Sequence, residues 1–389
     1  MRDIGPWITN KGNMLVVWIF IVLGILYSAI ILYFYIGLFR IKSVNQKNRL
    51  TVSVLVPARN ESRNIEACLE SLWNQTYPRN LFEVVVIDDH STDETSQIVK
   101  KFISDKPNFR LLHHRNDGDR PTYKKQALKF ALDSVSREVV MTIDADTIAQ
   151  PSWVESMISQ YDSRTGMVAG LVTFAREMEE SLFHKMQTLE FAGIVFCGAG
   201  GVGNKNPLIC NGSNLSYRMQ AFRDAGGYEG NLHLPSGDDD LLLQNIHKHT
   251  DWKVRYSVAH ETVNYTRPAK HLKSFLNQRA RWASKSLHYP SKMLFPVLFS
   301  IYLYYAFIFI LLPFTMAGLF PVKFYLIGLL LKIVPEFLVM LKSMAILRRR
   351  NLLLLFPLAQ FFQVPYILYA GLMGFLNKFS WKDPNGDNA

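Results

Sequence analysis

Cysteine is scarce in this chain. The 389 residues include three cysteines, Cys68, Cys197 and Cys210, and no two of them form a CxxC pair. This spacing indicates neither a disulfide framework nor a metal site made of cysteine thiolates. Internal repeats and low-complexity stretches are also absent between residues 51 and 290. The length suits one core with membrane segments added, or two small domains.

Charged residues are absent from a long stretch near the start, residues 14–39. This stretch exceeds the roughly 20 apolar residues that cross a bilayer as a helix. A cleaved signal peptide would have a shorter apolar region and a small-residue cleavage site, and neither is visible. We therefore expect a retained transmembrane helix at 14–39. Further transmembrane helices are expected at 293–322, 324–347 and 352–376.

Basic residues predict how these segments are oriented. A basic cluster follows the first segment, and Arg348-Arg349-Arg350 separates the last two. Because basic loops stay on the cytoplasmic side, residues 40–292 are expected in the cytoplasm and the tails 1–13 and 377–389 outside. The expected location is the plasma membrane or an inner membrane, with the lipid bilayer as a partner.

The net charge is +11, from 43 Lys and Arg against 32 Asp and Glu. Such a balance is compatible with nucleic acid, an anionic membrane face or phosphorylated substrates. The basic residues cluster near the predicted membrane boundaries rather than along an aromatic-rich groove. Membrane orientation therefore explains the charge better, and no nucleic-acid partner is predicted.

Between residues 51 and 290, short apolar runs alternate with helical patterns. The runs typical of buried strands are 52–56, 83–87, 110–112, 139–143 and 167–172, and the helical patterns are 64–73, 92–103, 123–132 and 152–161. Such alternation predicts an α/β fold, a mainly parallel sheet with helices on both faces. Ligands of such sheets bind at the carboxyl ends of the strands. A helical pattern at 181–196 indicates core packing or a helix in the membrane interface.

Two of the predicted strands end in aspartates. Asp88 and Asp89 follow one apolar run, and Asp144 and Asp146 follow another. Side chains alternate along a strand, so Asp144 and Asp146 are expected to point the same way. Two carboxylates placed together suit a divalent metal such as Mg²⁺ or Mn²⁺, and a solvated turn is the alternative interpretation.

Several motifs follow one another along residues 50–285. They are Val-Leu-Val-Pro-Ala-Arg-Asn-Glu-Ser at 54–62, Val-Ile-Asp-Asp-His-Ser-Thr-Asp at 86–93, Lys124, the Asp-x-Asp within 142–147, the loop 211–217 with 226–228, Ser-Gly-Asp-Asp-Asp-Leu at 236–241 and Gln-Arg-Ala-Arg-Trp at 278–282. The set and its order resemble the family 2 glycosyltransferases, and QxxRW is typical of membrane-embedded members. The chain is similar to the group of ceramide glucosyltransferase and the cellulose, hyaluronan and poly-N-acetylglucosamine synthases.

The resemblance implies a GT-A fold, a nucleotide-sugar donor such as a UDP-sugar, Mn²⁺ or Mg²⁺, and transfer with inversion. It assigns donor binding to Pro57, Ala58, Glu61, Asp88, Asp89, Lys124, Asp144, Gln278, Arg279, Arg281 and Trp282, and metal binding to Asp144 and Asp146. It makes Asp239 the catalytic base. Most relatives have Thr-Glu-Asp where this chain has Gly-Asp-Asp, which leaves the register open by one residue. Asp238 is therefore a second catalytic candidate, or a ligand of an acceptor hydroxyl.

The chemistry of such a transfer suits these residue types. A carboxylate at a helix N-terminus is kept ionised, as a base must be, although simple capping is the alternative for one aspartate of the triple. Arg279 and Arg281 suit the oxygens of a departing diphosphate. The cytoplasmic GT-A domain is expected at 40–266. Residues 267–292 are expected to form a basic amphipathic helix on the membrane surface that carries QxxRW, and such a helix could also close the site. Trp282 is expected to stack on an acceptor sugar or to anchor this helix at the interface.

Lys332 and Glu336 are charged residues four apart within a predicted span, so they can pair. Charge inside a membrane is costly and often functional. They are expected to face the bundle interior near an acceptor or product path, or to form a self-compensating pair between helices. The histidine pairs His113-His114 and His247-x-His249 have no other likely ligands near them in sequence, and are expected at the surface or in the core.

The leading hypothesis is a membrane glycosyltransferase acting on a lipid or lipid-linked glycan. A processive polysaccharide synthase is the alternative within this class, because QxxRW occurs in both. An alternative of another class is a non-catalytic membrane protein with a degenerate transferase domain, and the retention of Asp146 and Asp239 argues against it.

Overall fold

The computed structural model describes residues 11–115, 123–230, 232, 237–285, 289 and 294–379. These residues form two compact units. The sheet unit consists of the described parts of Gly37–Ser181 and Ile194–Pro268, and the helical unit of Leu182–Gly193 and the described parts of Met1–Ile36 and Ala269–Ala389. Most of the two predicted external tails, 1–13 and 377–389, lies outside the described residues.

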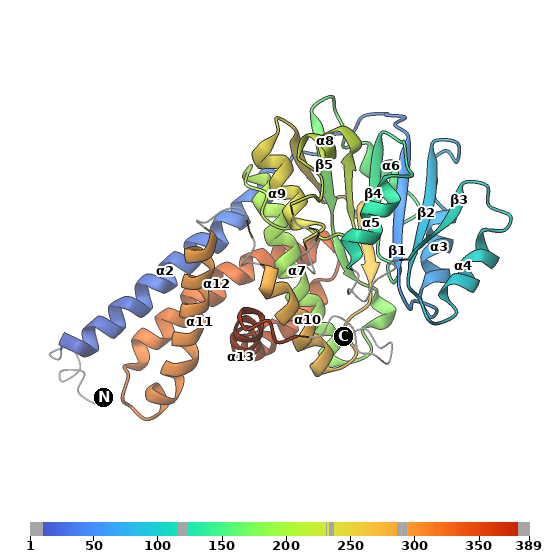
Figure 1. Ribbon diagram of the computed structural model, residues 1–389. Coiled ribbons are helices and arrows are strands. Elements are labelled where there is room, and N and C mark those ends of the chain that lie inside the picture. The colour runs from blue at the N-terminus through green and yellow to red at the C-terminus, as the bar shows by residue number, and fades with distance from the viewer. Residues whose placement is uncertain are drawn as a thin grey trace. The chain divides into compact units, whose positions relative to one another are not determined.

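The sheet unit contains a seven-stranded sheet (Figure 1). Its strands are β1 (Val52–Ala58), β2 (Phe82–Asp89), β3 (Phe109–His114), β4 (Val139–Thr142), β5 (Thr165–Gly170), β7 (Leu215–Arg218) and β8 (Lys253–Ser257), in the order β3-β2-β1-β4-β7-β5-β8. Neighbouring strands are parallel except at β7, which runs antiparallel to both β4 and β5. The predicted α/β fold with a mainly parallel sheet is therefore confirmed.

The apolar run 167–172, predicted as one strand, belongs to two different sheets. β5 ends at Gly170, and β6 (Val172–Phe174) pairs with β9 (Asn264–Thr266) in a separate two-stranded sheet. The Nδ2 atom of Asn214 donates hydrogen bonds to the carbonyls of Leu171 and Thr262, at 2.7 and 2.6 Å. The Asn214 side chain thus binds the carbonyl of Leu171, the residue that directly follows β5. The apolar sequence of 167–172 gives no sign of this contact.

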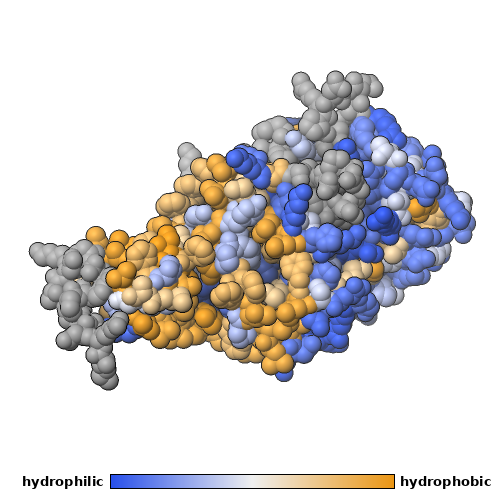
Figure 2. All heavy atoms as spheres, turned by 90° about the horizontal axis from the view of Figure 1, so that it is seen from below, coloured by the Kyte–Doolittle hydropathy of each residue, from blue (hydrophilic) through white to orange (hydrophobic). Residues whose placement is uncertain are grey.

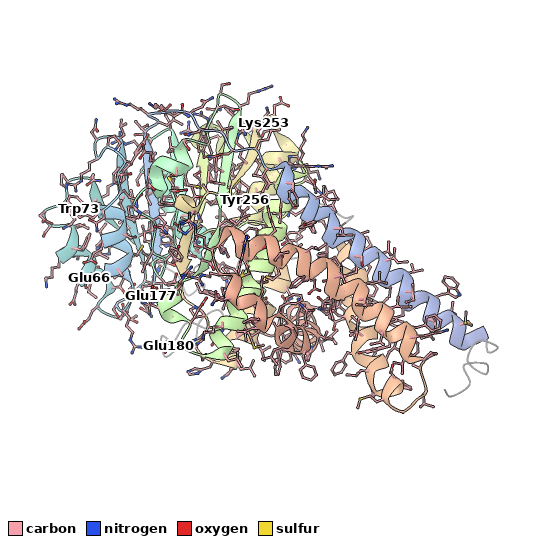
Figure 3. The ribbon with its side chains drawn as sticks, turned by 180° about the vertical axis from the view of Figure 1, so that it is seen from behind. Glu66, Trp73, Glu177, Glu180, Lys253 and Tyr256 are labelled. Carbon is pink, nitrogen blue, oxygen red and sulfur yellow. The ribbon has the colours of Figure 1, made fainter. Side chains whose placement is uncertain are left out.

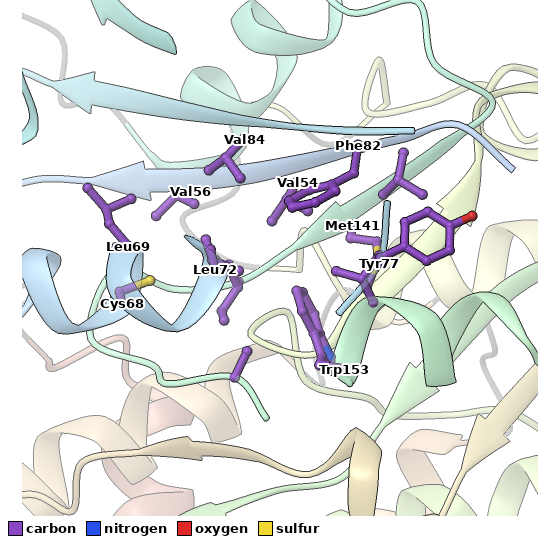
Figure 4. Close-up of a cluster of buried hydrophobic side chains, with 14 of the residues drawn as sticks. Val54, Val56, Cys68, Leu69, Leu72, Tyr77, Phe82, Val84, Met141 and Trp153 are labelled. Atoms are coloured by element: carbon purple, nitrogen blue, oxygen red, sulfur yellow. The ribbon is translucent and has the colours of Figure 1, made fainter. Parts of the chain in front are cut away.

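The helices of the sheet unit are α3 (Ile65–Trp73), α4 (Thr95–Ile103), α5 (Lys124–Leu132), α6 (Trp153–Ile158), α8 (Met219–Asp224), α9 (Asp240–His249) and the Ile194–Gly203 part of α7 (Leu182–Gly203). Alternate residues of β1 and β2 pack with buried side chains of α3 and α6 in one core cluster (Figure 4). Intervening residues such as Leu55 and Val85 are also buried, and α5 contacts these two strands. Successive strand residues point to opposite faces, so both faces of the sheet are covered.

Helix α3 shows how the sequence pattern produces this packing. Its apolar residues Ile65, Cys68, Leu69 and Leu72 recur at helical spacing and are buried, whereas Glu66 is exposed. Figure 3 marks Glu66 and Trp73 on this helix, and Lys253 and Tyr256 on β8. Truncating a fully buried leucine such as Leu72 to alanine typically costs about 2–5 kcal/mol.

The helical unit contains α10 (Leu272–Ser284), α11 (Leu294–Met316), α12 (Val322–Ile346), α13 (Phe356–Phe375) and most of α2 (Lys11–Arg40). Among the described residues, four helices are long and apolar enough to cross a membrane: Met14–Arg40, Leu294–Met316, Val322–Ile346 and Arg350–Phe375. Four such helices were predicted. The segment predicted at 293–322 is shorter as a helix, because the chain turns at Gly318, where φ is +72°.

Large apolar side chains cover the outside of the helical unit. On the face drawn in Figure 2, hydrophobic residues, coloured orange, gather over the helices of this unit. The exposed apolar residues of the unit include Leu15, Trp18, Phe309, Leu330 and Phe361, which are 52–70% exposed. An exposed apolar surface of this extent marks a site of membrane or protein contact. Together with the length of the helices, it is the surface expected of a bundle in contact with lipid.

Lys332 and Glu336 lie inside this bundle, as predicted. The Nζ atom of Lys332 lies 3.1 Å from Oε1 of Glu336, and the two residues are 1% and 8% exposed. The other helices complete the cluster. Tyr27 and Tyr305 donate hydrogen bonds to Glu336, Gln360 donates to Glu336 and accepts from Lys332, and Gln363 accepts from Lys332. All four candidate spans therefore contribute a polar group to one closed network, which favours a self-compensating pair over an open path.

Removing one charge from this network should destabilise the bundle more than removing both. Glu336→Leu leaves the ammonium of Lys332 buried without its carboxylate, a change that costs about 3–5 kcal/mol in folded proteins. The double variant, which carries both Lys332→Leu and Glu336→Leu, leaves neither charge buried. Its loss of stability should therefore be smaller than that of Glu336→Leu alone. Thermal unfolding of the purified protein in detergent measures this. An inactive but equally stable double variant would instead support the acceptor-path hypothesis.

Candidate active site

The predicted site residues of the sheet unit gather at one edge of the sheet. Ala58 at the end of β1 pairs with Asp88 on β2, and Leu55 pairs with Thr142 at the end of β4. The carboxyl ends of these three parallel strands thus lie next to one another. Asp144 and Asp146 follow β4 and are both half-buried, whereas Ala145 between them is buried. Both aspartates lie beyond the end of the strand, at a turn, so the expectation that their carboxylates point the same way stays a prediction.

Lys124, the first residue of α5, joins two of the predicted catalytic and metal-binding groups. Its Nζ atom lies 2.6 Å from Oδ1 of Asp144 and 3.1 Å from Oδ2 of Asp238. Burial acts to lower the pKa of Lys124, but Asp144, Asp238 and Asp239 outweigh burial and raise the pKa well above its ordinary value. Lys124 is therefore a permanent cation between two carboxylates that lie 94 positions apart in the chain.

Asp238 and Asp239 have different environments. Asp239 is the N-cap of α9, where its Oδ1 accepts a hydrogen bond from the N–H of Asp240 at 2.7 Å and its Oδ2 one from the N–H of Gly212 at 3.2 Å. Asp240 accepts from the N–H of Cys210. Asp238 instead points its carboxylate at Lys124. The capping alternative therefore falls on Asp239, and Asp238 shares a cation with the Asp-x-Asp motif.

Two glycines make room for this arrangement. Gly237 has a φ of +94°, a backbone conformation that is strained for residues other than glycine. It directly precedes Asp238 and sets the direction in which the chain enters the site. A Cβ atom on Gly212 would lie 2.9 Å from Oδ2 of Asp238 and 3.1 Å from Nζ of Lys124. The carbonyl of Gly212 also accepts from Oγ1 of Thr142 at 2.7 Å. Gly212 was not among the predicted site residues, although its motif was recognised. Ser236 lies outside the described residues.

Asp88 and Asp89 at the end of β2 lie against histidines of β3. Parallel pairing sets Asp88 opposite His113 and Asp89 opposite His114. Nδ1 of His113 is 3.1 Å from Oδ2 of Asp88, and Nδ1 of both His90 and His114 is 2.8 Å from Oδ1 of Asp89. His113 is exposed and His114 is buried, as expected, but their aspartate partners were not predicted. The sequence could not show this, because strand pairing brings together residues 25 positions apart.

Asp89, His90 and His114 form a group whose ligand atoms lie within 4.8 Å of one another, so they are a second possible cation site. The carboxylate oxygens of Asp144 and Asp146 are the first, and oxygen ligands are those that Mg²⁺ and Mn²⁺ prefer. Cys68 lies beneath the first pair. Burial raises the pKa of its thiol, and Asp146, Asp144 and Glu61 raise it further. Cys68 therefore stays a neutral thiol near neutral pH.

The remaining predicted donor-binding residues divide between the two units. Pro57 and Ala58 end β1 beside Ile87 and Asp88. Glu61 is 9% exposed and its Oε2 accepts from Nδ2 of Asn64. Gln278, Arg279, Arg281 and Trp282 lie on α10 in the helical unit. Their expected approach to the donor therefore stays a prediction.

Comparison with known proteins agrees with this architecture. Residues 53–226 match the family model described as Glycosyl transferase family 2. This part of the chain is therefore similar to that family. Proteins similar to this chain include glycosyltransferase AglE of Haloferax volcanii, 28% identical over 239 residues, which are 59% of this chain and 71% of AglE. Poly-beta-1,6-N-acetyl-D-glucosamine synthase of Staphylococcus epidermidis is 25% identical over 242 residues, 60% of this chain and 53% of that protein. The chain thus matches little more than half of the synthase's length.

A solved structure shares the fold over nearly the whole chain. Mannosyltransferase PcManGT of Pyrobaculum calidifontis, solved with GDP-Man and Mn²⁺, superposes with a TM-score of 0.61 over 93% of this chain and 99% of its own, at 18% identity. The sheet unit therefore has the predicted GT-A-like fold.

Proposed function

We propose that the protein is an inverting glycosyltransferase that moves a sugar from a nucleotide-sugar donor to a membrane-associated lipid or lipid-linked glycan. The observation that carries this proposal is the contact of Lys124 with both Asp144 and Asp238. It brings a cation, the predicted metal-binding motif and a candidate base together at the carboxyl edge of the sheet. The glycosyltransferase relatives and the nucleotide-sugar complex of PcManGT support the reaction class.

Asp238 is the base in this proposal. The acceptor hydroxyl oxygen attacks the anomeric carbon of the sugar and gives its proton to the carboxylate of Asp238. The bond between that carbon and the phosphate oxygen breaks, and the nucleoside diphosphate leaves with the electron pair. Asp239 is the weaker candidate because both of its carboxylate oxygens accept backbone N–H groups. Its role is to hold the start of α9 and the Gly212 loop together, and thereby to place Asp238.

Asp144 and Asp146 would hold Mn²⁺ or Mg²⁺, since their oxygens are of the kind these ions bind. When bound, the ion supplies positive charge against the departing diphosphate. Lys124 supplies further positive charge at the same edge. Pro57, Ala58, Glu61, Asp88 and Asp89 line this edge and are proposed to contact the nucleoside of the donor. For Gln278, Arg281 and Trp282, a role in binding donor and acceptor rests on the resemblance of their motif.

The acceptor is proposed to be a lipid because the described residues offer few spans for a polymer channel. Four candidate membrane helices are present among the described residues, and their charged network is closed within the bundle. The basic loops support a cytoplasmic position for the proposed catalytic domain, on the side where a soluble nucleotide sugar would reach it. The similarity to a poly-N-acetylglucosamine synthase keeps a processive synthase as the second candidate.

Release of nucleoside diphosphate tests the proposal directly. The full chain, purified in detergent with Mn²⁺, would be incubated with UDP- and GDP-sugars, with and without membrane lipid extract, beside Asp238→Asn. We expect release from one donor, dependent on lipid and absent from the variant. A sugar polymer formed without added lipid would favour the synthase. No release from any donor, under conditions in which PcManGT is active, would contradict the proposal.

Metal dependence should follow Asp146 rather than His114. Asp146→Asn removes one negative charge from the proposed ion site, and we expect the Mn²⁺ concentration for half-maximal activity to rise about tenfold or more. His114→Ala should leave that concentration unchanged. Mn²⁺ binding followed by electron paramagnetic resonance gives the same comparison without turnover. The reverse pattern would assign the ion to Asp89, His90 and His114.

A further inference from the structure

A buried ion pair holds α10 in the helical unit. The guanidinium of Arg279 donates to both carboxylate oxygens of Glu190 on α7, with Nε 2.8 Å from Oε1. The side chains of Arg279 and Glu190 are only 4% and 10% exposed. Two hydrogen bonds between one guanidinium and one carboxylate fix the relative orientation of the side chains as well as their separation, because both groups are planar.

Other groups complete the environment of this pair. Tyr366 on α13 donates from its Oη to Oε1 of Glu190 at 3.0 Å. The guanidinium carbon of Arg279 lies 4.5 Å from the ring centre of Phe275 and 4.3 Å from that of Trp282. Its Nη1 donates to the side-chain oxygen of Gln278. Helices α7, α10 and α13 therefore meet around one arginine, which in turn contacts two residues of the QxxRW motif.

We infer that Glu190 is a positioning residue for the QxxRW motif. It acts through Arg279, which is therefore not a ligand of the donor. All of the charge on Arg279 faces protein groups, so a phosphate would have to displace Glu190 to reach it. Through Arg279, Glu190 sets the side-chain orientations of Gln278 and Trp282. This inference rests on the proposed function, in which Gln278, Arg281 and Trp282 bind donor and acceptor. The two arginines of the motif therefore have different roles. Arg279 positions the motif, whereas Arg281 takes part in binding donor and acceptor.

The chemistry of this ion pair predicts how its variants should differ in their kinetics with the donor. Glu190→Gln keeps the size of the side chain but removes its charge, so the fork loosens and the motif loses its fixed orientation. Misplacement of binding groups by about 1 Å can cost about 100-fold in rate. We expect kcat/KM to fall by about 10- to 100-fold, mostly through a rise in KM for the donor. Arg279→Lys keeps the charge but not the planar fork, and should resemble Glu190→Gln.

The experiment measures kcat and KM for the donor in Glu190→Gln, Glu190→Asp, Arg279→Lys and Tyr366→Phe. Lys273→Ala, an exposed change on the same helix, is the matched control and should match the wild type. Glu190→Asp should recover part of the loss, which a residue needed only for folding would not show. Tyr366→Phe removes a single hydrogen bond, so it gives a smaller rise in KM even if Glu190→Gln fails to fold.

Two results would overturn the inference. One is wild-type KM and kcat in folded Glu190→Gln and in Tyr366→Phe. The other is a loss of stability in all variants with unchanged KM, which would make the pair purely structural. Binding of UDP or GDP with Mn²⁺, measured by titration calorimetry, separates this failure from failure of the proposed function. A wild type that releases no nucleoside diphosphate contradicts the function, whereas an active wild type with an unaffected Glu190→Gln contradicts only the positioning role.

Discussion

Asp238→Asn should lower kcat by about 100- to 10,000-fold, the range expected for loss of a general base. Asparagine has almost the same shape as aspartate but cannot take the proton of the acceptor hydroxyl. The variant should still fold, because the carboxylate of Asp238 contacts Lys124 rather than the backbone that begins α9. The measurement is the initial rate of nucleoside diphosphate release at saturating donor, with the thermal midpoint recorded for the same preparation.

Asp239→Asn is the matched comparison, and it should show the opposite pattern. The amide keeps one oxygen acceptor but presents an NH₂ group to one of the two backbone N–H donors. We expect a loss of about 1–3 kcal/mol in folding stability, with kcat within about tenfold of the wild type. If Asp239→Asn abolishes turnover without loss of stability and Asp238→Asn does not, then the base is Asp239, as the family resemblance first indicated.

Lys124→Met should lower kcat/KM for the donor by about 100-fold or more, because it removes a preorganised cation from the site. It should also tighten Mn²⁺ binding. Without the ammonium, the carboxylate of Asp144 no longer has a competing positive partner at 2.6 Å. Mn²⁺ titration in the absence of donor measures the second effect independently of turnover. A fall in activity with weaker Mn²⁺ binding would contradict the arrangement.

The pH dependence gives a further check on Lys124. Its pKa in the folded protein is raised above the unfolded value of about 10.4. The ion pairs therefore contribute their full stabilisation below that value, and they lose it only as the pH rises through the folded pKa. From neutral pH to about pH 10, no loss of activity or stability should come from Lys124. Lys124→Arg, which keeps the charge, should retain more activity than Lys124→Met.

Much of the fold could be predicted because its signals are local. Buried parallel strands such as β1 and β2 read as continuous apolar runs, and α3 has its apolar residues at helical spacing. The four candidate membrane helices follow from length and composition. β7 could not be predicted in the same way. Its antiparallel place between β4 and β5 depends on pairings with residues far away in the chain.

The site divides in the same manner. Its residue types and their order along the chain were enough to indicate an acidic, metal-binding edge and a glycosyltransferase-like chemistry. They could not choose between Asp238 and Asp239, because adjacent aspartates are equivalent in a sequence. Only the folded chain distinguishes them, by giving one the ammonium of Lys124 and the other the backbone N–H groups of Gly212 and Asp240.

The sequence by itself determined the α/β class, the four candidate membrane helices and the carboxyl edge at which the candidate site lies. Hydrophobic periodicity, helix length and strand-end chemistry are properties of neighbouring residues, so they can be read along the chain. The tertiary structure alone decided which carboxylate meets Lys124, why His113 and His114 face aspartates, and that Arg279 is bound by Glu190. Each of these depends on contacts between residues 25 to 114 positions apart, and such contacts exist only after the chain has folded.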